Sequence, residues 1–93
     1  MKNAVNEKIL IEGGPGEIKI FFDENLYAVN REDIKTSISA AILNGLLTGA
    51  DLDGLDYGTI VCKYNPVRVD IFSATIAAKK LAELIESCAP AGA

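Results

Sequence analysis

Apolar and polar residues alternate along two short runs near the start of the chain, residues 8–12 and 17–23. Alternation with a period of two places successive side chains on opposite faces of a strand, so each run predicts a β-strand. The segment 13–16 between them, Gly-Gly-Pro-Gly, predicts the turn of a β-hairpin. Pro15 and Gly16 suit the centre of a type II turn, because proline fixes the first φ and glycine accepts a positive second φ.

The hairpin has a definite register if Gly14 faces Glu17. The face that we expect to enter the core then consists of Ile9, Ile11, Ile18, Ile20 and Phe22. The opposite face consists of three cross-strand pairs, Lys8 with Asp23, Leu10 with Phe21, and Glu12 with Lys19. Opposite charges on both sides of an apolar pair make this register internally consistent. Because two-residue hairpins prefer mirror-image turns, a longer loop is the alternative.

Apolar residues at helical spacing follow this hairpin, after a short third strand that the pattern predicts over 26–29. Asn30 is a favourable N-cap, and Glu32 and Asp33 occupy the first turn, where the helix dipole favours negative charge. The apolar stripe consists of Ile34, Ile38, Ala41, Ile42 and Leu46, with Ala40, Leu43 and Leu47 beside it. A stripe this broad predicts burial from two directions, and Gly49 is the expected C-terminal stop.

A second hairpin and a second helix are expected in the last third of the chain. Residues 59–64 and 67–72 alternate on either side of the Asn-Pro dipeptide at 65–66, which predicts two more strands. Their core face consists of Ile60, Cys62, Tyr64, Val67, Val69 and Ile71. Ser73 is the expected cap of the final helix, and Pro90 is expected to end it. The apolar stripe of that helix consists of Ala77, Leu81, Leu84, Ile85 and Cys88.

Together these elements predict an α+β fold in the order β-β-(β)-α-β-β-α, where the parenthesis marks the short strand after the first hairpin. We expect an antiparallel sheet of four to five strands with two helices on one face. A length of 93 residues suits one domain, and 49% hydrophobic and 24% charged residues are ordinary for a folded globule. We assign 8–89 to this domain, 1–7 to a flexible N-terminus and 90–93 to a short tail.

The charge of the chain argues against several classes of partner. The net charge is −4 and the pI about 4.6, and the basic residues are scattered, with only Lys79 and Lys80 adjacent. Duplex nucleic acid and anionic membrane surfaces both require a basic face, so we expect neither as a partner. The first residues lack the apolar stretch of a signal peptide, and two cysteines make no disulfide framework. A cytoplasmic location with reduced thiols is therefore the expectation.

Motifs for catalysis, metal binding and cofactor binding do not stand out. The glycine-rich segment 13–16 lies between two strands, whereas a phosphate-binding loop leads from a strand into a helix. The acidic segment 51–56 fails the calcium-loop pattern, because its sixth position is Asp56 and its twelfth is Cys62. The sequence contains no histidine, which excludes a Cys–His nucleophile pair and removes the commonest general base. We expect no catalytic residue, metal site or cofactor, and favour a protein that is not an enzyme.

Apolar residues also fall on the sheet face that we expect to be turned away from the helices. They are Leu10, Phe21 and Val61, with Phe72 at the edge of that face. If these side chains are contiguous, they predict an interface with a protein partner or with a second copy, and the charged neighbours make a suitable polar rim. Scattered exposed residues, or a cover formed by the N-terminal segment, are the alternatives.

The resulting hypothesis is a non-enzymatic protein–protein interaction module, such as an adaptor, inhibitor or assembly subunit, that forms a homo-oligomer through this face. An alternative from another class is a small-ligand binding protein or minor enzyme, with a site at the sheet–helix or oligomer seam. Its first candidate residues are Tyr27, Tyr57, Tyr64 and the acidic loop 51–56. A third alternative, mimicry of nucleic acid by the acidic surface, is disfavoured by the low charge density.

Overall fold

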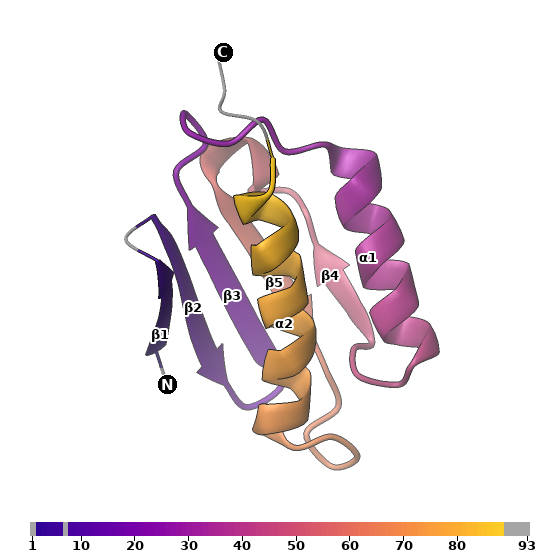
Figure 1. Cartoon of the computed structure of the whole chain (residues 1–93). Helices are drawn as coiled ribbons and strands as arrows, with labels where there is room; N and C mark the ends of the chain where they lie inside the picture. The colour runs from indigo at the N-terminus through magenta and orange to yellow at the C-terminus, as the bar shows by residue number, and fades with distance from the viewer. Residues whose placement is uncertain (1, 7, 89–93) are drawn as a thin grey trace.

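An antiparallel sheet lies behind two helices that cover one of its faces (Figure 1). The computed structural model describes residues 2–6 and 8–88. The elements of this part of the chain are β1 (Lys2–Asn6), β2 (Ile9–Gly14), β3 (Glu17–Phe22), α1 (Arg31–Leu43), β4 (Gly49–Asp51), the 3-10 helix η1 (Leu55–Tyr57), β5 (Thr59–Lys63) and α2 (Ile71–Glu86). The strands lie in the order β1-β2-β3-β5-β4. The α+β class, the antiparallel sheet and the two helices on one face are confirmed.

The first hairpin has the register that the sequence predicts. Leu10 pairs with Phe21, Glu12 with Lys19, and Gly14 with Glu17, which leaves a two-residue turn rather than a longer loop. Gly16 adopts φ +80 in that turn. The side chain of Tyr64 stabilises the same turn, since its hydroxyl donates a hydrogen bond of 2.9 Å to the Gly14 carbonyl.

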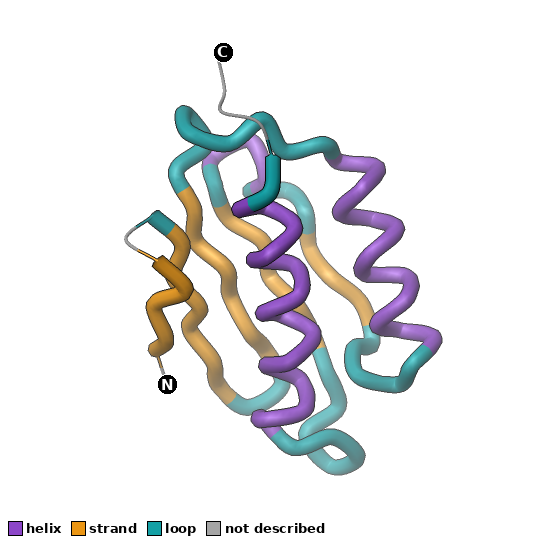
Figure 2. The backbone as a smooth tube through the Cα atoms, in the orientation of Figure 1, coloured by secondary structure: helices purple, strands orange, loops and turns teal. Residues whose placement is uncertain are grey.

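The third strand of this part of the sheet is not where the sequence placed it. Residues 26–29 form part of a loop (Figure 2), because β2 and β5 already occupy both edges of β3. Tyr27 and Val29 nevertheless pack against the core from this loop. The additional strand is β1, which pairs antiparallel with β2 and lies in the range that the sequence analysis assigned to a flexible N-terminus.

Helix α1 begins as predicted and ends earlier than predicted. The Asn30 side chain accepts hydrogen bonds from the backbone N–H groups of Glu32 and Asp33, at 2.8 and 3.4 Å. The helix ends at Leu43, and the expected stop at Gly49 is wrong, since that residue begins β4. Within α1 only Ile34 and Ile38 are buried, so the expected burial from two directions is also wrong. The reason is that α1 lies at the edge of the layer, beside the short strand β4 (Figure 1).

The predicted second hairpin is wrong in its second strand. Strand β5 lies between β3 and β4, so neither of its edges is free to pair with residues 67–72. Instead, Asn65 accepts backbone hydrogen bonds in a turn, and Asp70 caps α2 by accepting from the Ser73 N–H at 2.8 Å. Ser73 therefore lies in the first turn of α2 and is not its cap.

The core fills the space between the sheet and the helices. Its buried residues are Ile9, Ile11, Ile18, Ile20, Phe22, Ile34, Ile38, Leu47, Leu55, Ile60, Cys62, Tyr64, Ala74, Ala77, Ala78, Leu81, Ala82 and Ile85. Small alanines on the inner side of α2 let this helix pack closely across β2 and β3. Each buried isoleucine contributes about 1.5–3 kcal/mol of transfer free energy. Ile9, Ile11, Ile18, Ile20 and Ile60 on the inner faces of β2, β3 and β5 therefore contribute substantially to stability.

Candidate interaction surfaces

The face of the sheet opposite the helices brings together three of the four residues that the sequence singled out. Leu10 pairs directly with Phe21, and Val61 on the neighbouring strand lies diagonally from Phe21, since Phe21 pairs with Thr59 and Lys19 pairs with Val61. All three side chains are half-buried. We call the surface formed by Leu10, Phe21 and Val61 the outer sheet face.

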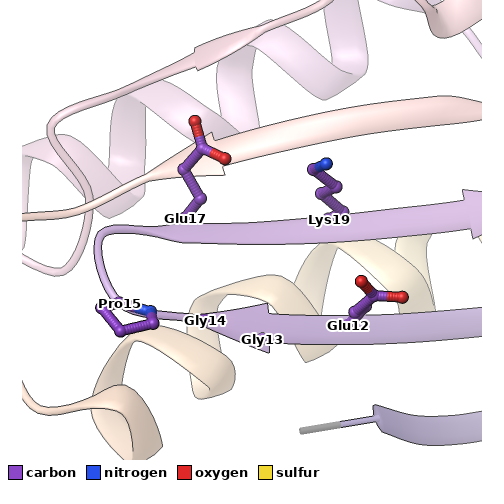
Figure 3. Close-up of a pocket in the computed structure, with 6 residues that line it drawn as sticks. All are labelled: Glu12, Gly13, Gly14, Pro15, Glu17 and Lys19. Carbon is purple, nitrogen blue, oxygen red and sulfur yellow. The ribbon is translucent and has the colours of Figure 1, made fainter.

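Charged residues border the outer sheet face toward the hairpin turn. Glu12 pairs with Lys19, and Glu17 pairs with Lys63, so opposite charges face each other across two strand pairs. Figure 3 shows Glu12, Glu17 and Lys19 around a hollow of about 150 Å³, which Gly13, Gly14 and Pro15 complete. Glu12 and Glu17 together with Lys19 and Lys63 make two carboxylates and two ammonium groups, so the charge balances locally. This arrangement suits the polar rim of an interface better than a catalytic site.

Phe72 is not on the sheet, which corrects its expected place at the edge of the outer face. It lies in the first turn of α2, because Asp70 starts a helix where the sequence pattern predicted a strand. Its side chain is 72% exposed, and Ile76 one turn later is 52% exposed. Both point away from the buried stripe of α2, since they lie on the opposite side of the helix from Ala78 and Ile85.

Further exposed apolar side chains lie at the same end of the helical layer. Val67, in the loop before α2, is 91% exposed, and Ile42 and Leu43, at the end of α1, are 42% and 88% exposed. Figure 1 shows that α1 ends and α2 begins at the same end of the molecule. We call the five exposed residues Ile42, Leu43, Val67, Phe72 and Ile76 the helix-end residues. They belong to three segments and do not share one face, since Leu43 lies opposite the buried Ile34 and Ile38 of α1.

Sequence reasoning missed the exposure of the helix-end residues because it assigned most of them to buried faces. Val67 was expected on the core face of a strand, and Ile42 in the stripe of α1. One signal was available, since Phe72 and Ile76 are four residues apart and out of phase with the stripe of Ala77, Leu81 and Ile85.

A second hollow, of about 290 Å³, lies at the other end of the molecule. It is lined by Glu24, Tyr27, Ala28, Val29, Arg31, Leu55 and Asp56. Of the residues expected to bind a small ligand, this hollow unites only Tyr27 with Leu55 and Asp56 of the acidic loop. Tyr57 is 81% exposed and does not line it, and Tyr64 is a buried residue whose hydroxyl serves the hairpin turn.

Comparisons with protein-family models, with curated proteins and with solved structures find no match.

The described residues offer little for covalent or metal chemistry. Burial raises the pKa of the Cys62 thiol to about 12, which keeps it in the unreactive thiol form near neutral pH. Groups of three or more His, Cys, Asp or Glu side chains placed to hold a metal ion do not occur in this part of the chain. Neither α1 nor α2 has the length and apolar character needed to cross a membrane, and the described residues contain no other candidate.

Proposed function

We propose that this chain is a non-enzymatic protein–protein interaction module that self-associates through its outer sheet face. The observation that carries the proposal is that the two helices cover only one face of the sheet. Both helices lie on one face, and the opposite face presents Leu10 beside Phe21, with Val61 diagonal to Phe21 on β5. Apolar side chains on an uncovered sheet face are typical of surfaces that stack against a second sheet.

The pairing of the strands is compatible with a symmetric dimer. A twofold axis parallel to the strands, between β2 and β3, would place Leu10 of one copy over Phe21 of the other. The same axis would place Glu12 over Lys19, so that opposite charges meet across the interface. An apolar centre with a charge-complementary rim is the arrangement that favours a second copy as the partner.

The experiment is light scattering coupled to size exclusion, at two protein concentrations about a hundredfold apart. We expect a mass above that of a monomer at the higher concentration, and a monomer for the Leu10→Asp, Phe21→Asp double variant. Ser39→Asp, on the exposed side of α1, is the matched control and leaves the association unchanged. An unchanged mass for the double variant would refute self-association through this face.

The cysteines support a reducing, cytoplasmic location within the same proposal. Cys62 and Cys88 are both free, and Cys62 lies in the core, so the fold contains no disulfide to stabilise it. Measuring stability with and without a reductant tests this point, and equal unfolding midpoints are expected.

Small-ligand binding is a second candidate function, favoured by the hollow between Glu24, Tyr27, Arg31 and Asp56. Its volume of about 290 Å³ is at the small end of the range for ligand sites. Thermal-shift measurements across a metabolite and metal panel test it, with Tyr27→Ala as the site variant. A flat response of the parent protein would remove this candidate.

A further inference from the structure

We propose that the hollow between the loop 23–30 and the 3-10 helix η1 binds a small amino acid with an apolar side chain. This ligand class specifies the second candidate function, small-ligand binding, and depends on it. The hollow is separate from the outer sheet face, because its lining residues belong to the loop, the start of α1 and η1. One molecule can therefore hold the ligand and pair with a second copy at the same time.

Two hydrogen bonds, one short and one long, hold the segments around the hollow. The Phe22 N–H donates to the Gly58 carbonyl at 2.8 Å, which ties the start of the loop to the end of η1. The Arg31 guanidinium lies 3.5 Å from the Leu52 carbonyl, which places the start of α1 beside the residues before η1. Figure 2 shows the loop and η1 at one end of the molecule. The hollow is thus formed by the fold itself, as ligand sites usually are.

The floor and walls of the hollow are apolar. Leu55 is buried in the core, and Tyr27 and Val29 are half-buried and pack against the core from the loop. An apolar group that enters the hollow removes this surface and its own surface from water, which is favourable in proportion to the area buried. The volume of about 290 Å³ suits a side chain of the size of leucine rather than a large cofactor.

Charged side chains form the rim of the hollow. Glu24 and Asp56 supply two carboxylates, Arg31 supplies one guanidinium, and all three residues are exposed. Within residues 2–6 and 8–88, none of these three side chains forms an ion pair. Opposite charges therefore line the same hollow without pairing to each other, which leaves a partner for an anionic group and for a cationic group of a ligand.

The charges of the rim select a zwitterion. An ammonium group finds its partners in Glu24 and Asp56, and a carboxylate finds its partner in Arg31, since guanidinium binds carboxylates through two parallel hydrogen bonds. An amino acid with an apolar side chain carries both charges at one end and an apolar group at the other. This polarity matches a charged rim above an apolar floor.

The same rim argues against two other classes of ligand. A simple anion would meet two carboxylates for one guanidinium, which is unfavourable. A divalent cation such as Ca²⁺ takes six to eight oxygen ligands, several of them carboxylates. The described part of the chain contains no group of three or more His, Cys, Asp or Glu side chains placed to hold a metal ion.

The probe is L-leucine, compared with isopentylamine, which lacks the carboxylate, and with 4-methylpentanoate, which lacks the ammonium group. Each compound is titrated into the full chain to about 20 mM, because a ligand of so few atoms on an open hollow binds in about the millimolar range. We expect leucine to shift the amide resonances of Tyr27, Val29 and Asp56. Each analogue is expected to bind about three- to tenfold more weakly, since it loses one charged contact at an exposed rim.

Variants that remove one charge test the role of each side of the rim. Arg31→Gln is expected to remove the advantage of leucine over isopentylamine. Glu24→Gln with Asp56→Asn is expected to remove the advantage of leucine over 4-methylpentanoate. Lys79→Gln and Glu83→Gln, which are exposed on α2 and do not line the hollow, are the matched controls and keep both preferences. All replaced side chains are exposed, so the variants are expected to fold, and circular dichroism checks this.

Three outcomes would overturn the proposal. The first is no shift with leucine while other compounds of the thermal-shift panel bind, which would leave small-ligand binding intact and exclude the amino acid. The second is equal binding of leucine and its two analogues, which would show that the charged rim takes no part. The third is a flat response to the whole panel, which would remove the ligand class together with the second candidate function. Self-association is measured separately, as the mass in light scattering, and none of these outcomes changes it.

Discussion

Replacing Gly58 by alanine tests the close approach between η1 and the end of β3. Gly58 adopts φ +79, and its carbonyl accepts a hydrogen bond of 2.8 Å from the Phe22 N–H. A Cβ atom at residue 58 would overlap the Phe22 carbonyl oxygen and would lie 3.1 Å from the Glu24 carboxylate. The obstacle is therefore backbone, which cannot move aside as the end of a flexible side chain can.

The expected loss of stability follows from two separate costs. An L-residue in the left-handed conformation costs about 1–2 kcal/mol. Shifting a packed backbone to relieve an overlap costs about 1–3 kcal/mol more. The sum, about 2–5 kcal/mol, is a large part of the 5–10 kcal/mol that we expect for a domain of this size.

Two other glycines of the chain provide matched controls. Gly45 has φ +75 and no atom within 4 Å of its virtual Cβ, so Gly45→Ala reports the conformational cost alone, about 1–2 kcal/mol. Gly14 has neither a positive φ nor a neighbour within 4 Å, so Gly14→Ala is expected to lie within about 0.5 kcal/mol of the parent.

The assay is urea unfolding followed by far-UV circular dichroism for the parent and the three variants. The expected order of destabilisation is Gly58→Ala, then Gly45→Ala, then Gly14→Ala. If Gly58→Ala costs no more than Gly45→Ala, the close approach to Phe22 does not exist in solution and the packing of η1 described above is wrong.

Two further predictions concern acid and thiol chemistry. The hydrogen bond from the Ser73 backbone lowers the pKa of Asp70 below its ordinary 3.8, so its stabilising effect is complete above pH 3.8 and is lost as the pH falls through the lower folded-state pKa. Urea unfolding is measured from pH 6 to 2. As the pH falls, the free energy of unfolding is expected to decrease less for Asp70→Ala than for the parent, and equal decreases would contradict this role. Burial raises the pKa of Cys62 to about 12, and in the variant Cys88→Ser this is the remaining thiol. Cys62 in that variant is therefore expected to react with a thiol reagent at pH 8 only after urea unfolds the protein. Rapid labelling of this variant in native buffer would show that Cys62 is not buried.

Local signals account for the parts of the fold that were predicted correctly. The alternation on both sides of Pro15 and Gly16, with opposite charges in facing positions, is sufficient to set the hairpin register and to bring Leu10 beside Phe21. Asn30 and its acidic successors likewise mark the start of α1. Each of these signals acts over a few residues, so the sequence around it contains all the information that it needs.

The end of the second predicted hairpin shows where local signals are ambiguous. Val67, Val69 and Ile71 alternate as a strand would, yet Asp70 starts a helix there. Alternation could not decide the outcome, because a strand also requires a free edge, and β3 and β4 occupy both edges of β5. Phe72 was consequently assigned to the sheet, and the exposure of the helix-end residues was not foreseen.

The sequence by itself determined which segments are amphipathic, where the first hairpin turns and where α1 begins, because spacing and capping are properties of neighbouring residues. Only the tertiary structure decided that β1 extends the sheet beside β2, that β5 lies between β3 and β4, and that five apolar residues remain exposed at one end of the helices. These outcomes depend on competition among segments far apart in the chain for the same sheet edges and the same core volume. The residue pattern of a single segment does not determine the outcome of such competition.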